Sequence, residues 1–291
     1  MTATSLARLS ADISSIVTAI SPGVVAIRSP HARCSGFVWK PGLVVTANDA
    51  LADDENIAIF LPGGTRVEAT LAGRDPSTDI AVLRVPADTA QPADLHPVLP
   101  SVGAITISVG SDRGNALAAL GIVSTVGPAW QSMRGGDINA RIELDLSMRR
   151  VAEGGLAVDA SGQAFGMTVF GPRRRVLVIP AETISHVAGK IETDGKIERG
   201  YLGLALQPVR VAESPGFGLM VMGVEQGGPG AKAGVQQGDV IVRVNGREIA
   251  SPLALQRSLG PSRVGTTLAM DVRRSGTDTK LELLVGTRPA T

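Results

Sequence analysis

Short runs of branched apolar residues, separated by Gly, Pro and Asp, follow one another from Val24 to Ile179. Runs of this length and punctuation predict antiparallel strands at the spacing of a β-barrel. A first set of strands is expected at Val24–Arg28, Gly36–Trp39, Val44–Thr46, Ile57–Leu61, Val67–Gly73 and Ile80–Val85. A second set is expected at Ala104–Val109, Ala116–Val126, Ala140–Leu144, Leu156–Val158, Ala164–Phe170 and Arg175–Ile179. The pattern therefore predicts a mainly β fold with two six-stranded barrels.

A helical pattern precedes the strands. Its apolar positions are Ile13, Ile16, Val17 and Ile20, which recur at the spacing of one helical face. Pro22 ends the pattern, because proline interrupts a helix interior. We expect a short helix over Ser10–Ile20.

The last third of the chain is organised differently. Lys190–Arg199 is charged and poor in apolar residues, which is typical of a linker. Beyond it, Pro229 suits the first turn of a helix, Asn245-Gly246 suits a tight turn between strands, and Pro252–Leu259 predicts a second helix. The expected domains are 1–190 and 201–291, joined by a linker over 191–200.

Composition narrows the class of protein. A length of 291 residues suggests two domains, and 44% hydrophobic with 19% charged residues describes a globular chain. The net charge of +1 gives no electrostatic case for binding nucleic acid or a membrane surface. Cys34 is the single cysteine, which excludes an internal disulfide. Asp12, Ser14 and Ser15 interrupt any leader-like apolar run, so we expect a cytoplasmic location.

Three segments resemble the catalytic turns of the HtrA (DegP) family of serine proteases. The segment 42–50 resembles the strand and turn that carry the family's histidine, and 77–85 resembles the strand that carries its aspartate. The segment 152–158 stands where the family has its nucleophile loop. The resemblance covers nearly the whole chain. It implies a trypsin-like double six-stranded β-barrel followed by a PDZ domain, which is a small α+β, partly open barrel.

At the three catalytic positions the chain carries carboxylates. Asp49 stands in place of the histidine, Asp79 is the family's aspartate, and Glu153 stands in place of the serine. Serine-protease chemistry needs a hydroxyl whose proton a nearby imidazole can take. The histidines, His31, His96 and His186, lie in segments that match none of the catalytic turns. The sequence therefore predicts a degenerate triad, no catalytic residue, no cofactor, and a chain that is not an enzyme.

A cluster of carboxylates leaves two alternatives to an inert cleft. At about 4 Å and an effective dielectric near 20, two like charges repel by roughly 4 kcal/mol. Three carboxylates would therefore protonate, splay apart or hold a cation, which makes Asp49, Asp79 and Glu153 a weak candidate metal site. Hydrolysis by paired carboxylates would need an aromatic-lined cleft, and aromatic residues are only 3% of the chain.

The C-terminal domain resembles a PDZ domain of the bacterial protease-associated type. The segment 200–204 resembles its carboxylate-binding loop, and 228–246 resembles its central helix, strand and turn. The resemblance implies that Tyr201, Leu202, Gly203 and Leu204 bind a peptide carboxylate. It also implies that Pro252 and Gln256, one helical turn apart, face the peptide.

We therefore expect a non-catalytic, HtrA-like pseudoprotease that acts as a scaffold, assembly factor or regulator. Its partner would be another protein, bound through a C-terminus or an extended peptide in the PDZ groove. The alternative is a metal-binding protein or an unusual hydrolase that uses Asp49, Asp79 and Glu153. Trimers of the family rely on aromatic residues near the N-terminus, whereas here none precedes Phe37, so we expect a monomer or dimer.

Two basic clusters, Arg149-Arg150 and Arg173–Arg175, interrupt the second barrel pattern. Adjacent arginines are usually a solvated loop, and the alternative is an anion or partner site.

Overall fold

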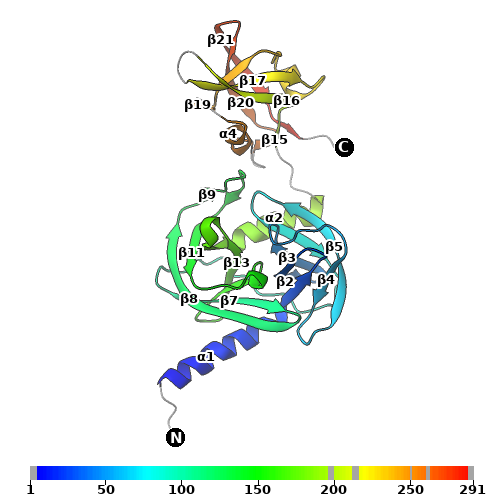
Figure 1. Cartoon of the computed structure of the whole chain (residues 1–291), viewed down its shortest axis with the longest axis vertical. Helices are drawn as coiled ribbons and strands as arrows, with labels where there is room; N and C mark the ends of the chain where they lie inside the picture. The colour runs from blue at the N-terminus through cyan, green and yellow to red at the C-terminus, as the bar shows by residue number, and fades with distance from the viewer. Residues whose placement is uncertain (1–4, 196–199, 212–215, 250, 260–262, 288–291) are drawn as a thin grey trace. The chain divides into compact units, whose positions relative to one another are not determined.

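The computed structural model describes residues 5–195, 200–211, 216–249, 251–259 and 263–287 (Figure 1). The chain divides into two compact units. One unit comprises residues 1–130 and 137–197, and the other comprises 131–136 and 198–291. No described helix has the length and apolar character needed to cross a membrane.

Two closed barrels of six antiparallel strands form the first unit, as the sequence pattern predicts. The first barrel has the order β1-β2-β3-β6-β5-β4 and the second has the order β11-β14-β13-β12-β7-β8. The first barrel contains β1 (Val24–Arg28), β2 (Arg33–Lys40), β3 (Leu43–Ala47), β4 (Ile57–Phe60), β5 (Arg66–Asp75) and β6 (Ile80–Arg84). The second contains β7 (Ile105–Asp112), β8 (Asn115–Gly127), β11 (Arg141–Asp145), β12 (Leu156–Asp159), β13 (Ala164–Phe170) and β14 (Val176–Pro180).

Short elements connect these strands. They are the 3₁₀ turns η1 (Ser21–Gly23), η2 (Arg150–Ala152) and η3 (Pro172–Arg174), and the ribbon of β9 (Trp130–Gln131) with β10 (Asp137–Ile138). Two of the turns, η2 and η3, belong to the loops that carry the arginine clusters.

Strands where the barrels meet are buried on both faces. In β3, Val44 packs inside the first barrel, whereas its neighbour Val45 packs in a second core between the barrels. The same alternation separates Leu83 from Val82 in β6. Because successive side chains of a strand point to opposite faces, a strand between two cores is apolar at every position. This explains why the strands read as continuous hydrophobic runs.

In chain order, one helix precedes the barrel strands of the first unit and another follows them. Helix α1 (Ser5–Ile20) begins five residues before the expected Ser10 and has no fully buried residue. Helix α2 (Ala181–Asp194) was not expected, and it runs into the predicted linker. Its buried positions include Ile184, Val187, Ala188 and Ile191, spaced along one face. Charged and polar residues lie between these apolar positions, so the helical period is weak in the sequence. The helix ends at Gly195, which has a left-handed backbone.

The second unit contains a sheet with the strand order β16-β17-β18-β20-β21, with β19 paired to β18. Its strands are β15 (Gly200–Tyr201), β16 (Leu204–Arg210), β17 (Phe217–Val224), β18 (Val240–Val244), β19 (Arg247–Glu248), β20 (Thr267–Arg274), β21 (Thr277–Leu284) and β22 (Gly286–Thr287). Helix α3 (Pro229–Lys232) begins at the expected proline, and α4 (Pro252–Arg257) follows β19. Asn245 and Gly246, at φ 48° and 75°, form the expected tight turn between β18 and β19.

Candidate functional site

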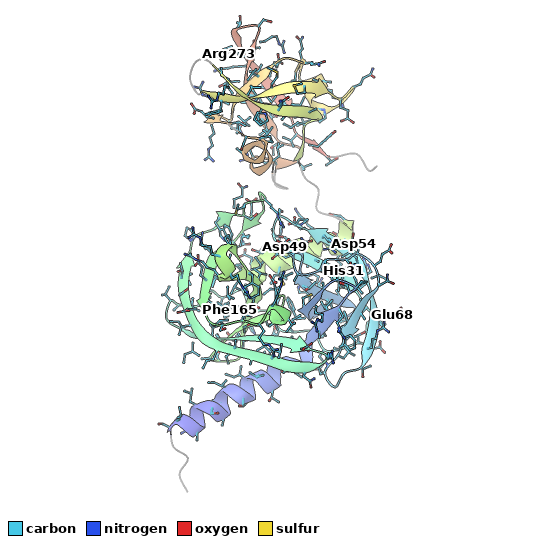
Figure 2. The ribbon with its side chains drawn as sticks, in the orientation of Figure 1. His31, Asp49, Asp54, Glu68, Phe165 and Arg273 are labelled. Atoms are coloured by element: carbon cyan, nitrogen blue, oxygen red, sulfur yellow. The ribbon has the colours of Figure 1, made fainter. Side chains whose placement is uncertain are left out.

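The ends of two adjacent strands bring Asp49 and Asp79 together. Asp49 follows the end of β3, and Asp79 directly precedes β6, which pairs with β3. The backbone N–H of Asp49 donates to Oδ1 of Asp79 at 2.7 Å, and the N–H of Asn48 donates to the Asp79 carbonyl at 3.2 Å. Figure 2 shows Asp49 where the two barrels adjoin. Asp79 therefore fixes the backbone that carries Asp49.

Glu153 enters the same region from the second barrel. It follows η2, is 6% exposed, and its carbonyl accepts the N–H of Ser35 at 2.8 Å. Its Oε1 accepts the backbone N–H of Phe170 at 3.0 Å. Burial raises the pKa of the Glu153 carboxyl, the Phe170 N–H and Arg150 oppose that rise, and Asp49 adds to it. The two carboxylates at the expected positions are thus near enough to affect each other.

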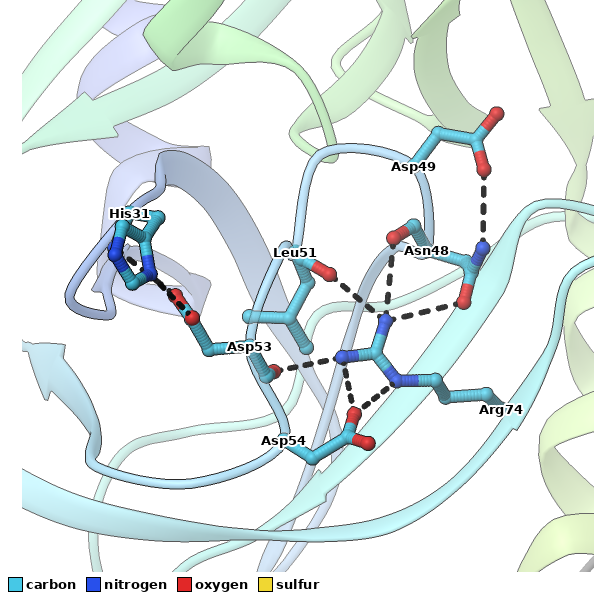
Figure 3. Close-up of polar contacts among 7 residues, drawn as sticks. All are labelled: His31, Asn48, Asp49, Leu51, Asp53, Asp54 and Arg74. Carbon is cyan, nitrogen blue, oxygen red and sulfur yellow. Dashed lines mark hydrogen bonds and ion pairs between the residues drawn. The ribbon is translucent and has the colours of Figure 1, made fainter.

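The loop after β3 is held by one arginine that the sequence analysis missed (Figure 3). Arg74, at the end of β5, donates from its guanidinium to groups along residues 48–54. The acceptors are Asp54 Oδ1 at 2.7 Å from Nε, Leu51 O at 2.8 Å, Asp53 O at 2.7 Å, and Asn48 Oδ1 at 3.1 Å. Asn48 in turn donates from Nδ2 to Asp49 Oδ1 at 3.0 Å. The sequence contains no local signal of this role, because Arg74 lies 20 to 26 residues from its acceptors.

The hydroxyl of Ser35 and the thiol of Cys34, in the strand whose Ser35 N–H bonds to Glu153, have structural roles. Ser35 Oγ donates to the Val151 carbonyl at 2.7 Å and accepts the Ser111 N–H at 2.9 Å. Cys34 is buried, as expected for a small apolar side chain. Burial raises the pKa of the Cys34 thiol to about 12, so the thiol stays protonated and is a poor nucleophile.

The backbone N–H groups around Glu153 donate to the protein itself. Within η2 the N–H of Ala152 donates to Arg149 O at 2.9 Å and the N–H of Glu153 donates to Arg150 O at 3.2 Å. Gly154 N–H donates to Thr168 O at 2.8 Å. An oxyanion hole needs such N–H groups to point at the substrate oxygen. In this conformation they point at carbonyls of the chain.

Of the three histidines, His31 contacts the loop 48–54 through Asp53 (Figure 3), whereas His96 and His186 lie elsewhere in the first unit. His31 Nδ1 lies 2.8 Å from Asp53 Oδ1, and hydrogen bonds from His31 and Ser29 lower the pKa of Asp53 to about 2. His96 lies 3.2 Å from Asp94, and His186 is exposed on α2. Among the residues that the structure describes, no three His, Cys, Asp or Glu side chains are grouped to hold a metal ion. The weak candidate of Asp49, Asp79 and Glu153 is not among such groups.

Contacts with other residues of the second unit hold the predicted carboxylate loop in place. Leu202 is buried, and Gly203 has a φ of 67°, which favours glycine. The Leu202 carbonyl accepts the N–H of Gly230 at 2.8 Å, and the Tyr201 hydroxyl donates to Glu225 at 2.6 Å. Glu225 was not predicted from the sequence, because it lies 24 residues from Tyr201 and the contact is not local.

The predicted groove elements lie beside this loop. Leu204 begins β16 and is partly buried against the core of the unit. Pro252 begins α4, and Gln256 belongs to the same helix, although its side chain lies outside the described residues.

Comparisons with known proteins identify both parts of the chain. The trypsin-like peptidase domain family matches residues 34–167, and the PDZ domain family matches 200–285. Probable periplasmic DegP-like serine endoproteases of Rhizobium meliloti (strain 1021) and Brucella suis biovar 1 (strain 1330) are each 31% identical, over 90% and 89% of this chain. The alignments cover 54% and 53% of those proteins, so the chain spans about half their length.

Solved structures have the same fold. A serine endoprotease from Yersinia pestis is 25% identical, with a TM-score of 0.70 and coverage of 99% of this chain and 100% of the other. The HtrA-type protease AlgW with a decapeptide is 22% identical, with a TM-score of 0.68 and coverage of 96% and 99%, and supports the fold alone. The chain is therefore HtrA/DegP-like, with a trypsin-fold serine-protease domain followed by a C-terminal PDZ domain.

These relatives overturn the functional prediction. The expectations that the chain is not an enzyme, and that it is a non-catalytic scaffold, assembly factor or regulator, are contradicted because the relatives are named serine endoproteases. A metal-binding protein, stated as an alternative, is overturned with them. The prediction depended on two side chains, Asp49 and Glu153. The likeness to endoproteases instead extends over nine-tenths of the chain.

Proposed function

We propose that the chain is a DegP-like peptidase that captures peptides through its PDZ region. The peptidase half is supported by the names of the relatives that match about 90% of the chain. The capture half is supported by the edge of the sheet at β16. Among the described strands, β16 pairs with β17 alone, so its other edge has backbone groups that an added strand can use.

The residues of the PDZ region fit capture of an extended peptide. Pro208 lies within β16, and proline is tolerated in a strand at the sheet edge, where its missing N–H breaks no ladder. The loop 201–204 precedes this strand directly. Backbone N–H groups of such a loop can meet a terminal carboxylate, while the peptide lengthens the sheet. We propose a free C-terminus as the preferred ligand, with Tyr201 to Leu204 as the carboxylate loop.

We further propose that Asp49, Asp79 and Glu153 stand at the three triad positions of the trypsin fold. Their support is the pairing of Asp49 with Asp79 and the approach of Glu153 from the second barrel. The cleft thus has carboxylates where the relatives' names imply a serine mechanism. Peptide hydrolysis in this cleft also requires η2 to release the N–H groups that it now holds.

The test separates the two halves of the proposal. Purified chain is incubated with an unfolded protein substrate from about pH 4 to pH 9, which brackets the titration of carboxyl and imidazole groups. Products are identified by mass spectrometry, and Asp49→Asn and Glu153→Gln are compared with the control Glu68→Gln. Glu68 is exposed on β5, on the outer side of the first barrel (Figure 2).

Cleavage that is lost in both cleft variants and kept in the control supports the peptidase half. Cleavage that survives both variants, or no cleavage at any pH, overturns it. Binding of peptides with free and amidated C-termini is measured separately, so the capture half is tested whatever the cleavage result. The cytoplasmic location and the monomeric or dimeric state stay predictions, and the relatives are named periplasmic.

A further inference from the structure

Four arginines lie on the two turns that adjoin Glu153. Arg149 and Arg150 belong to the η2 turn, and Arg173 and Arg174 belong to the turn between β13 and β14. Both turns meet at Glu153. Arg150 lies three residues before it, and the ring of Phe170, whose N–H donates to Glu153, lies 5.4 Å from the Arg174 guanidinium. We call these four residues the arginine rim.

The arginine rim forms no close ion pair with the described residues of the protein, although Arg150 and Arg174 lie near enough to Glu153 to favour its charged form. All four residues are exposed, and in the described part of the chain no carboxylate lies within 4 Å of their guanidinium groups. The neighbouring Arg175 differs, because it shares Glu143 with Arg141, at 3.2 Å and 2.6 Å. Arg141 and Arg175 therefore share a carboxylate partner within the protein. The four arginines of the rim have no ion pair of this kind in the described residues.

The turn that presents Arg173 and Arg174 is strained. Both residues have left-handed backbones, at φ 57° and 60°, which side chains other than glycine rarely adopt. The Arg175 N–H donates to Pro172 O at 3.4 Å, which closes a tight hairpin turn. Such turns favour Asn-Gly, the pair that the chain uses at Asn245-Gly246. Local propensity therefore disfavours two arginines here, and strain of this kind is kept where a function requires the side chains.

We infer that the arginine rim is a subsite for an acidic side chain, Asp or Glu, of a peptide bound at the Glu153 cleft. This inference rests on the proposed peptide-handling function. A guanidinium binds a carboxylate with two parallel hydrogen bonds, and several guanidinium groups on two adjoining turns favour an anion. A nucleic acid is disfavoured because the net charge of the chain is only +1 and the rim is confined to two turns.

Fluorescence anisotropy with the full chain tests the subsite. The probes are three labelled peptides of one length, with acidic, neutral and basic central residues, all amidated at the C-terminus to remove carboxylate capture by the PDZ region. The acidic peptide should bind about tenfold more tightly than the neutral one at low salt. The preference should shrink as salt is added, since exposed charges are screened.

Two variants make the test specific. Arg173→Asn with Arg174→Gly removes both charges and gives the turn its favoured residues, so the fold is kept while the preference is lost. The matched control is Arg113→Gln, which removes an exposed arginine that also has a positive φ but lies on the β7–β8 turn beside Gly64. The control should keep the preference in full.

Equal affinities of the three peptides overturn the subsite, and so does an acidic preference that survives the double variant. In either case the capture half of the proposed function stands if a peptide with a free C-terminus still binds. Failure of every peptide, including that one, overturns the capture half as well. An oligonucleotide of equal charge that binds more tightly than the acidic peptide assigns the rim to nucleic acid and contradicts the inference.

Discussion

Glu153 of the barrel unit and Asp239 of the PDZ unit are both buried carboxylates, and the two are treated in opposite ways. In the PDZ unit, Asp239 receives two hydrogen bonds from Arg274, both at 2.8 Å, and one from the Gln236 N–H at 2.9 Å. The bonds from Arg274 lower the pKa of Asp239. In the barrel unit, Glu153 receives one bond from Phe170, and burial raises its pKa.

The difference separates a carboxylate with a structural ion pair from one whose charge the fold disfavours. Asp239 is in a bidentate ion pair that ties the turn before β18 to the end of β20. Glu153 has arginines near it but no such pair, so the fold holds a carboxylate in a position that disfavours its charge. Titratable groups kept in unfavourable surroundings are characteristic of functional sites. This contrast supports the Glu153 cleft as the site of the first unit.

The largest effect is expected at the glycine that places Glu153. Gly154 has a φ of 86°, and a Cβ there would lie 2.3 Å from the Ser35 carbonyl. Gly154→Ala should lower the free energy of unfolding by about 3 kcal/mol, through backbone strain and overpacking. The control Gly162→Ala has a similar φ of 84° with nothing within 4 Å, and should lose only about 1 kcal/mol.

Urea unfolding followed by tryptophan fluorescence measures both variants, because both tryptophans, Trp39 and Trp130, lie in the first unit. Equal losses in the two variants would show that the close approach of Gly154 to the first barrel does not hold Glu153 in place.

Neutralising the structural carboxylate should destabilise the second unit. Asp239→Asn replaces a charged acceptor of the Arg274 guanidinium by a neutral amide, and we expect a loss of about 2 kcal/mol. Hydrogen exchange of the β17 and β18 amides reports this unit separately from the tryptophans. If hydrogen exchange in β17 and β18 is unchanged in the variant, the Asp239 charge does not stabilise the second unit. The contrast between the two carboxylates would then be contradicted.

For Glu153→Gln we expect a smaller change in the free energy of unfolding, and in the stabilising direction. Because the pKa of Glu153 is raised in the folded chain, the wild type loses stability as the pH rises above the ordinary value of 4.5 towards the folded pKa. The variant lacks this loss, so its stability relative to wild type should rise over that window. Asp239 has a lowered pKa, so its contribution is present above 3.8 and is lost as the pH falls. Denaturation curves in which Glu153→Gln loses stability relative to wild type as the pH rises would show that the Glu153 pKa is not raised.

Much of the fold could be predicted from sequence because it is local. The barrel strands appear as apolar runs, and the Asn245-Gly246 turn follows from residue type. Helix α2 was missed because charged residues cover its exposed face. In the cleft, the positions of the three carboxylates follow from motif spacing, whereas the contacts of Arg74 and Phe170 join segments distant in sequence. The functional prediction was wrong because it weighed two side chains above the likeness of the whole chain to endoproteases.

The proposed function is tested most directly by the binding of one peptide in two forms, with a free and with an amidated C-terminus. Capture in the loop 201–204 predicts that amidation weakens binding by about 1–3 kcal/mol, because charge-assisted hydrogen bonds to the carboxylate are lost. The measurement is the difference in Kd by fluorescence anisotropy with the full chain. Equal affinities for the two forms would contradict peptide capture through the PDZ carboxylate loop.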